Sequence, residues 1–419
     1  MSDPSTGWAG RLGDRADRIP PWAIAAVAVL AHLWLMGRRV GAPSFILDKV
    51  FRTDAISILG GLSPYGDVGF EYPPLALPIL LGPEAATNST ADAYREVFGG
   101  VMVGFDLLIV GLLVAAFWRR PARMLGALVI FSAGLFLLKA LPLSRFDLVP
   151  AALTLAAALA RERGRSAAWG ALLGLGGAVK AYPLVLAPLF AAGEQRPLRA
   201  LAGLVAPMAL AAGLVVGIGD EAGSAVLYHT DRALQIETLA SSALIGAQAF
   251  GADLEVVFTS GSFNIAGDGA ELARVATSLL TGLGYLAVVT MVWRRRVPPV
   301  EAATAAIAVF VVLGPVLSPQ FLLWMLPLSA AAFGVSPANL LLVLATWTTR
   351  LLIDHGYAVQ VDLGTAFVVP LAGRNLLLAA YLVLVVAGLR RHGLRDRRHR
   401  RPRGWLRRPV WRRGDPAPA

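Results

Sequence analysis

The sequence predicts an all-α fold, a polytopic integral membrane bundle with about 12 spanning segments, within a range of about 10 to 14. Two features of composition support this fold class. The 419 residues are 56% hydrophobic, with a mean hydropathy of +0.63. Only 16% are charged, whereas about a quarter of the residues are charged in an ordinary soluble domain. The third observation is that long apolar runs recur along the whole chain, separated by polar or basic segments.

The apolar runs define the expected membrane segments in order. Several are shorter than the ~20 residues that a lone helix needs to cross a bilayer. Such segments can still serve when they pack among neighbours or are broken at prolines. We expect spanning or near-spanning segments at residues 21–37, 93–118, 122–140, 146–160, 166–180, 182–193, 198–218, 270–292, 299–317, 320–334, 337–353 and 372–390.

Basic clusters between these runs predict the orientation of the chain. Cytosolic loops of membrane proteins carry an excess of Lys and Arg. This rule places 1–20, 118–123, 161–165, 194–199, 293–298 and 391–419 on the cytosolic side. We therefore expect a cytosolic leader at 1–20, one membrane domain at 21–390 and a disordered arginine-rich tail at 391–419, with both termini cytosolic.

The net charge of +11 comes almost entirely from that tail and the residue before it, since twelve arginines lie between residues 390 and 413. A solvated tail that touches anionic lipid explains this charge, so we expect the lipid bilayer as a partner and no nucleic acid. The chain has no cysteine, which excludes disulfides, thiolate metal sites and cysteine nucleophiles. It also has no Walker A motif and no H-E-x-x-H motif.

The predicted outer loops, chiefly 38–92 and 219–269, hold most of the unusual polar residues together with the adjoining helix ends. The stretches that converge on this one face are "DKVFRTD", the loop "GGLSPYGDVGFEYPPLALPIL", "LSRFD", "VKAYP", "YHTDRALQIET", "LSPQ" and "TRLLIDHG". This distribution predicts a site at the outer membrane interface and not a pore through the bilayer.

Carboxylates of the first outer loop are candidates for a general base. Asp54 falls in a predicted short interfacial helix, where it could take a proton from a hydroxyl. Asp67 and Glu71 are competitors for the same role. The pair Pro73-Pro74 predicts the start of another short helix, because proline is tolerated in a first helical turn.

Cations on the same predicted face suit an anionic ligand, most simply a phosphate or pyrophosphate. A carboxylate base beside bound phosphate suggests group transfer from a lipid-linked phosphate. The cations concerned are Arg52, Arg145, Lys180, Arg232 and Arg350.

Five of these motifs occur together in one order: "TDAISILGGLSPYGDVGFEYPPLALPIL", "SRFDLVPAAL", "AVKAYPLVLAPL", "RALQIETLASS" and "LSPQFLLWMLPL". In this the chain resembles, from about residue 20 to 390, the GT-C glycosyltransferases of bacterial glycosyltransferase family 87. That family is represented by actinobacterial alpha-mannosyltransferases that use polyprenol-phosphate-mannose, and it has arabinofuranosyl relatives.

The resemblance implies an inverting sugar transferase of the bacterial plasma membrane with its active site on the outer face. Its donor would be a polyprenyl-phosphate sugar, most simply mannose with arabinofuranose as the alternative, and its acceptor a hydroxyl of a lipid or glycan. Asp54 would be the catalytic base. The donor phosphate would be bound by Arg145, Lys180, Arg232 and His229, and the sugar or acceptor by Tyr65, Glu71, Tyr72, Asp147, Tyr182, Gln235, Glu237, Ser318 and Gln320.

No metal or other cofactor is required, because cationic side chains can stabilise the leaving phosphate, although an external divalent cation on Asp48 and Asp54 stays open. A transporter or flippase of a lipid-linked glycan is the alternative function. Transport would favour ionisable residues in mid-membrane, and Asp106 is the notable residue of that kind.

Overall fold

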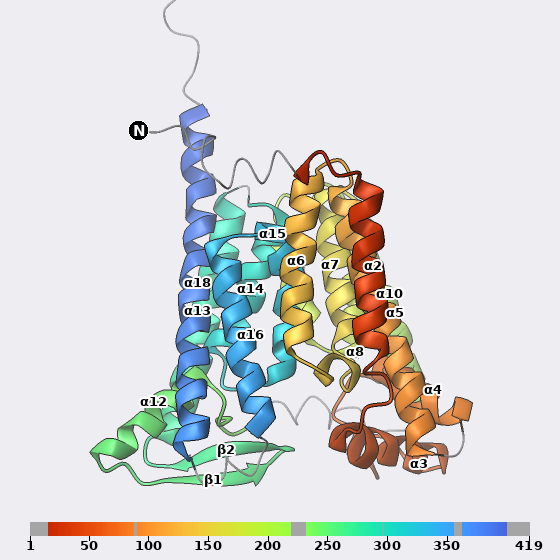
Figure 1. Cartoon of the computed structure of the whole chain (residues 1–419), viewed down its shortest axis with the longest axis vertical. Coiled ribbons are helices and arrows are strands. Elements are labelled where there is room, and N and C mark those ends of the chain that lie inside the picture. Colours follow the sequence, from red (N-terminus) through yellow and green to blue (C-terminus); the bar gives the residue numbers. More distant parts are fainter. Residues whose placement is uncertain (1–15, 88–89, 219–231, 296, 356–362, 400–419) are drawn as a thin grey trace, which may run out of the picture.

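The computed structural model describes residues 16–87, 90–218, 232–295, 297–355 and 363–399, which form a bundle of roughly parallel and antiparallel helices with a small β-hairpin at one end (Figure 1). Among the described residues, four helices are each long and apolar enough to cross a membrane: α5 (Ala91–Phe117), α10 (Pro197–Ile218), α13 (Ala270–Arg294) and α18 (Thr365–His399). The predicted all-α membrane fold class is confirmed at this level.

Most other helices of the bundle are shorter, and several apolar ones have 10 to 17 residues. The count of about 12 spans therefore stays a prediction. The shorter helices of the bundle, including α16 with 19 residues, are α2 (Pro21–Gly37), α6 (Pro121–Leu137), α7 (Leu148–Glu162), α8 (Ser166–Val179), α14 (Pro299–Leu313), α15 (Leu322–Phe333) and α16 (Pro337–His355).

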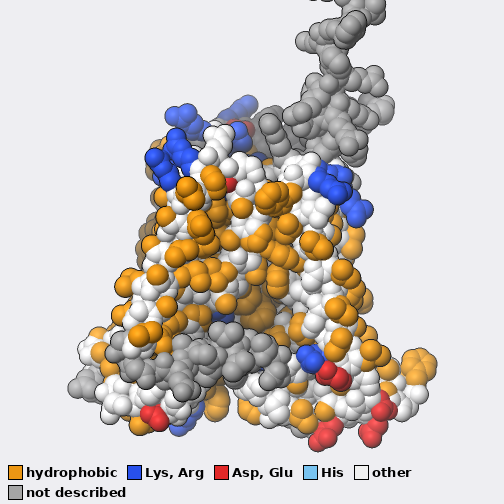
Figure 2. Space-filling view, turned by 180° about the vertical axis from the view of Figure 1, so that it is seen from behind, with side chains coloured by type: hydrophobic (Ala, Val, Ile, Leu, Met, Phe, Trp, Pro, Cys, Tyr) orange, Lys and Arg blue, Asp and Glu red, His pale blue; other side chains and the backbone are white. Residues whose placement is uncertain are grey.

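The two ends of the bundle differ in structure and charge. We name one the hairpin end, since it carries β1 (Leu254–Thr259), β2 (Ser262–Gly267) and α12 (Leu239–Ala247) (Figure 1). We name the other the arginine end, because Lys and Arg side chains gather there (Figure 2). Helix α18 runs from the hairpin end to the arginine end, and its last turns lie within the predicted tail.

The segment after α2 folds into short helices at the hairpin end. A π-helical turn, η2 (Leu47–Phe51), continues into α3 (Arg52–Leu59), so the predicted helix around Asp54 is confirmed. The proline pair also begins a helix as predicted, first as the 3₁₀ turn η3 (Pro74–Ala76) and then as α4 (Leu77–Thr87).

The β-hairpin is a structure that the sequence did not predict. Ser260 and Gly261 connect its strands, and both have positive φ, as a type I′ turn requires. Residues 234–236 pair with β2 as a short additional segment, since Ile236 N donates to Phe263 O and Ile265 N donates to Leu234 O. The hairpin thereby fixes Gln235, whose backbone N donates to Pro315 O across to the segment between α14 and α15.

Helices α8 and α10 approach each other through glycines. A Cβ atom at Gly170, Gly174 or Gly203 would overlap a backbone carbonyl oxygen of the facing helix. Small residues spaced four apart allow this close backbone contact between membrane helices. The contact fixes α8, which leads directly to Lys180.

Candidate active site

Lys180 and Asp147 form an ion pair at the centre of the hairpin end. Lys180 follows the last residue of α8 in an extended conformation, and Asp147 immediately precedes α7. Lys180 Nζ donates to Asp147 Oδ1 at 2.7 Å, and Trp324 Nε1 donates to the same oxygen at 2.6 Å. Asp147 is 1% exposed, and its Oδ2 has no hydrogen-bond partner among the described residues. One carboxylate oxygen is therefore left to receive a further donor.

Aromatic rings surround the Lys180 ammonium. Its Nζ lies 5.5 Å from the ring centroid of Tyr72, 5.1 Å from that of Phe146 and 5.3 Å from that of Trp324, within the range of cation–π contacts. Trp324 in turn stacks on Tyr182 at 4.1 Å and on Phe321 at 4.0 Å. The stacked rings offer a flat apolar surface beside a buried charge pair.

Asp54 and Glu71 bring negative charge to the same neighbourhood. Burial, together with the charge of Glu71, raises the pKa of Asp54 to about 6. The same Glu71 acts on Tyr72: burial and the carboxylates of Glu71 and Asp147 raise the pKa of the Tyr72 phenol, against the opposing charge of Arg145. Glu71, Arg145 and Asp147 therefore lie close enough to Tyr72 for their charges to act on its phenol, and Asp54 lies within reach of the charge of Glu71.

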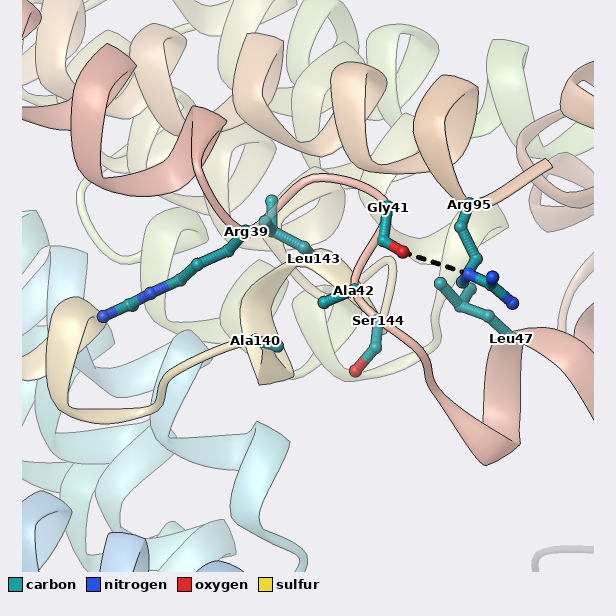
Figure 3. Close-up of a pocket in the computed structure, with 8 residues that line it drawn as sticks. All are labelled: Arg39, Gly41, Ala42, Leu47, Arg95, Ala140, Leu143 and Ser144. Carbon is teal, nitrogen blue, oxygen red and sulfur yellow. Dashed lines mark hydrogen bonds between the residues drawn. The ribbon is translucent and has the colours of Figure 1, made fainter. Parts of the chain in front are cut away.

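The helix that carries Asp54 is fixed by two ion pairs. Arg52 Nε donates to Glu84 at 2.9 Å, which joins α3 to α4. Arg95 of α5 donates to Asp48 Oδ1 at 2.6 Å and, through Nε, to Gly41 O at 3.1 Å (Figure 3). The small cavity beside this contact has a volume of about 10 Å³, which is too little to enclose a sugar.

Asp67, the other competitor for the base, caps its own turn. The carboxylate accepts from Ser63 N at 2.9 Å, and the side chain is exposed. Tyr65 closes the same loop, because its hydroxyl donates to Tyr72 O at 2.9 Å. Gly61 and Gly69 in this loop have φ of 102° and 69°, which favour glycine.

Gln235 and Ser318 meet close to the aromatic stack. Gln235 Nε2 donates to Ser318 Oγ at 3.0 Å, while Gln235 Oε1 is buried without a hydrogen-bond partner among the described residues. Gln320 is half-buried in the 3₁₀ turn η7 (Pro319–Phe321), directly before the stacked Phe321. These amide and hydroxyl groups could hydrogen-bond a polar ligand.

The other predicted site residues have contacts of their own. Arg232 donates to Ser260 O and Ser262 Oγ, both at 3.2 Å, at the turn of the hairpin. Glu237 accepts from the buried Arg374 of α18 at 2.5 Å. Arg350 contacts Asp354 at 3.6 Å. His229 lies outside the described residues.

The comparison with protein families decides the class of this protein. The model of glycosyltransferase family 87 matches residues 70–319, which is more than half of the chain. The chain belongs to glycosyltransferase family 87. It is therefore a membrane glycosyltransferase, and an enzyme. The search of curated proteins gives no match.

The family model matches only part of the residue cluster around Tyr72 and Lys180 in this glycosyltransferase. Glu71, Tyr72, Arg145, Asp147 and Lys180 lie within the matched residues. Asp54 and Trp324 lie outside them, one on each side.

Trp324, Phe146 and Arg374 are residues of this enzyme that sequence reasoning missed. Trp324 stands inside the quoted motif "LSPQFLLWMLPL", and an indole shortly after a proline break was a signal that could have been used. Arg374 gave no such signal, because its partner Glu237 is 137 residues away in the sequence.

Asp106, the carboxylate expected in mid-membrane, has structural partners. His32 Nδ1 lies 2.7 Å from Asp106 Oδ2, and His32 Nε2 lies 2.8 Å from Ser132 Oγ. The three residues join α2, α5 and α6, and both His32 and Asp106 are 0% exposed. This network explains Asp106 without a transport pathway.

No three His, Cys, Asp or Glu side chains gather to hold a metal ion within the part of the chain that the structure describes. Of the two carboxylates considered for an external cation, Asp48 already pairs with Arg95.

Proposed function

We propose that this glycosyltransferase moves a sugar, most simply mannose, from a polyprenyl-phosphate donor to a hydroxyl group of a glycolipid or glycan, with inversion at the anomeric carbon. The observation that carries the proposal is that acidic and basic side chains lie close together at the hairpin end. The carboxylates of Glu71 and Asp147 and the cations Arg145 and Lys180 lie around Tyr72, and Asp54 lies within reach of the charge of Glu71.

In the proposed reaction, the acceptor oxygen attacks the anomeric carbon from the face opposite the phosphate. The acceptor O–H bond breaks, and Asp54 takes the proton. The bond between the anomeric carbon and the phosphate oxygen breaks, and its electron pair leaves with polyprenyl phosphate. Glycosyl acceptor and polyprenyl phosphate are the two products, and the proton is later released to water.

Asp54 suits the base role on grounds of pKa. A carboxyl group whose pKa is raised to about 6 is still ionised at neutral pH and is a stronger base than an ordinary aspartate. Glu71 raises that pKa and is placed to contact the sugar, and it stays the alternative base. Asp67 is a weaker candidate for the base, because its carboxylate accepts a hydrogen bond within its own turn.

Lys180 and Arg145 suit the stabilisation of the departing phosphate. Both are partly buried, where charge stabilisation is worth more than in open water. The stack of Tyr182, Trp324 and Phe321 supplies an apolar face for a sugar ring, and Gln235 and Ser318 supply hydrogen bonds. Arabinofuranose is the alternative sugar for the same arrangement.

A donor screen with the purified protein tests the proposal. Polyprenyl-phosphate mannose, polyprenyl-phosphate arabinofuranose and a nucleotide sugar are each supplied with radiolabelled sugar and a membrane lipid extract as acceptor. We expect label in the acceptor from a polyprenyl-phosphate sugar, with the inverted anomer by NMR. Transfer from the nucleotide sugar alone would refute the donor assignment.

Variants complete the test. Asp54→Asn should lower the transfer rate by about 10²- to 10⁴-fold, the usual contribution of a general base. Asp67→Asn is the matched control, since it removes an exposed carboxylate of the same loop and should retain the rate.

We further propose that the hairpin end faces the outside of the bacterial plasma membrane and that both termini are cytosolic. The arginine end supports this orientation through the positive-inside rule. A reporter fused after the C-terminus should be active in the cytosol, and external activity would reverse the orientation.

A further inference from the structure

The largest cavity that we describe lies at the arginine end, at the opposite end of the bundle from Lys180 and Asp147. It has a volume of about 630 Å³. Its walls are the C-terminal ends of α5, α7 and α15 and the N-terminal ends of α6 and α14. Cavities of roughly 300 to 1,000 Å³ commonly hold small ligands. The sugar-transfer reaction proposed above makes no use of this space.

Cations predominate among the charged residues that line the cavity. Arg119, Arg120, Arg123 and Arg163 face only two carboxylates, Glu162 and Glu301. The excess of positive charge suits an anion, and guanidinium groups match the geometry of a phosphate.

Two of these arginines already have interaction partners within the protein. Arg123 donates to the carbonyl oxygens of Ala331 and Ala332 at 3.3 and 3.2 Å and lies over the Phe117 ring at 4.9 Å. Arg163 is close enough to Glu162 for their charges to interact, and the carboxylate of Glu162 also accepts from the Val300 backbone.

Arg119 and Arg120 are different. Both are exposed, and neither side chain has a hydrogen bond or ion pair with any described residue. They are consecutive at the start of α6, so their two guanidinium groups border the same cavity without a partner among the described residues. Two neighbouring arginines that border a cavity and have no partner among the described residues form a preformed binding site for one anionic group.

The rest of the lining is apolar and open to the side of the bundle. Ala115 is exposed and Trp118 is 45% exposed, and both lie at the end of α5, a helix long and apolar enough to span a membrane. An exposed tryptophan at such a helix end is typical of the lipid headgroup level. A ligand that carries both a phosphate and hydrocarbon fits this combination better than a free anion.

We propose that this cavity binds the phosphate group of an anionic membrane phospholipid. The phosphate is held by Arg119 and Arg120, and the hydrocarbon passes beside Ala115 and Trp118. The site is separate from the sugar-transfer site and lies on the opposite side of the bilayer from it. Its ligand is a constituent of the membrane and not a substrate.

Binding of short-chain lipids to the purified full-length chain tests this proposal. The probes are dioctanoyl phosphatidylglycerol, dioctanoyl phosphatidylcholine and inorganic phosphate, each titrated by microscale thermophoresis in a neutral detergent. We expect phosphatidylglycerol to bind and phosphatidylcholine to bind at least about tenfold more weakly, since an arginine near a membrane surface contributes about 1 kcal/mol toward anionic lipid and 1.4 kcal/mol corresponds to tenfold.

Two variants locate the site. Arg119→Gln combined with Arg120→Gln should weaken phosphatidylglycerol binding by about 10- to 30-fold. Ala115→Trp narrows the cavity at an exposed position while every arginine stays, and it should also weaken binding. The matched control replaces Arg196 and Arg199, which are exposed, precede or begin α10 and do not line the cavity, with glutamine.

Each outcome decides the proposal. Equal loss in the Arg196/Arg199 control would show attraction to general surface charge and overturn it, as would equal binding of the two lipids. Binding of inorganic phosphate with the affinity of phosphatidylglycerol, lost in the Arg119/Arg120 variant, would keep the anion site and overturn its assignment to a lipid. Sugar transfer by the Arg119/Arg120 variant should be unchanged, which separates this site from the proposed reaction.

Discussion

The ammonium group of Lys180 and the carboxylate of Asp147 connect the end of α8 to the start of α7 through a contact of 2.7 Å. Both residues are largely removed from water, with side-chain exposures of 15% and 1%. Removing one member of such a pair leaves the other charge uncompensated. The pair therefore fixes the position of a cation within the aromatic cluster, and the predictions below test the groups around it.

The rate of sugar transfer should rise with pH and level off above about pH 6. Asp54 accepts a proton only as a carboxylate, and burial and Glu71 raise its pKa to about 6, so protonation below that pH removes the base. The pH dependence of kcat/KM measures this. Glu71→Gln should move the rising limb to lower pH, because the neighbouring negative charge is gone. Activity retained in Asp54→Asn but lost in Glu71→Gln would instead make Glu71 the base.

Trp324→Phe should destabilise the protein through one hydrogen bond. Phenylalanine preserves an aromatic ring beside Tyr182 but removes the N–H that donates to the Asp147 carboxylate. Hydrogen bonds to charged groups contribute about 1.5 to 3 kcal/mol. Thermal unfolding in detergent measures the loss.

Trp293→Phe is the control for this prediction. Its Nε1 donates to a neutral acceptor, Pro188 O, and the residue is 59% exposed, so the expected loss is smaller. Equal losses in the two variants would show that the charge of Asp147 does not strengthen the Trp324 hydrogen bond.

Arg374→Met should reduce the free energy of unfolding by about 3 to 5 kcal/mol, because it leaves the buried Glu237 carboxylate without its partner. Adding Glu237→Gln should restore part of that loss. Double-mutant analysis of urea or thermal unfolding measures the coupling. A Glu237→Gln variant of normal stability with a raised KM would favour the sugar or acceptor contact that the sequence suggested.

His32→Leu should destabilise the bundle in the same manner, since Asp106 would keep a carboxylate among spanning helices without an imidazole partner. The double variant His32→Leu with Asp106→Leu should recover stability and retain sugar transfer. Loss of transfer in a stable double variant would contradict a purely structural role for this network.

Chelation should not affect transfer. Asp48 and Asp54 are the two carboxylates considered for a divalent ion. Asp48 forms an ion pair with Arg95, so it is not free to bind an ion together with Asp54. We expect the same rate with and without EDTA. A loss that added Mg²⁺ or Mn²⁺ reverses would place a metal ion in the reaction.

The sequence was sufficient for features with a local cause. Apolar runs predicted the helical membrane bundle, and the proline pair predicted the helix that begins at Pro74. Charge placement predicted that Asp54, Arg145, Asp147 and Lys180 belong to one site. In the structure Arg145, Asp147 and Lys180 lie near Tyr72, and Asp54 lies within reach of the charge of Glu71, while their shared role in binding substrate stays a prediction.

Features that depend on distant partners could not be predicted. The hairpin consists of two six-residue strands, LEVVFT and SFNIAG, and apolar runs of that length cannot be assigned to strand or helix by periodicity alone. Glu237 looked like a ligand contact because nothing local reveals Arg374. The roles of Gln235 and Arg232 likewise depend on where the hairpin lies relative to Ser318 and Ser262.

The glycine contacts between α8 and α10 have a consequence for evolution and for engineering of this enzyme. Because Gly170, Gly174 and Gly203 leave no room for even a methyl group, α8 and α10 pack directly backbone against backbone. Lys180 follows the last residue of α8, so this packing determines its position. Replacing Gly174 with alanine would push α8 and α10 apart and displace the Lys180 ammonium group, which lies less than two helical turns further along the chain. A substitution remote from every substrate atom could therefore alter turnover as strongly as one beside the sugar.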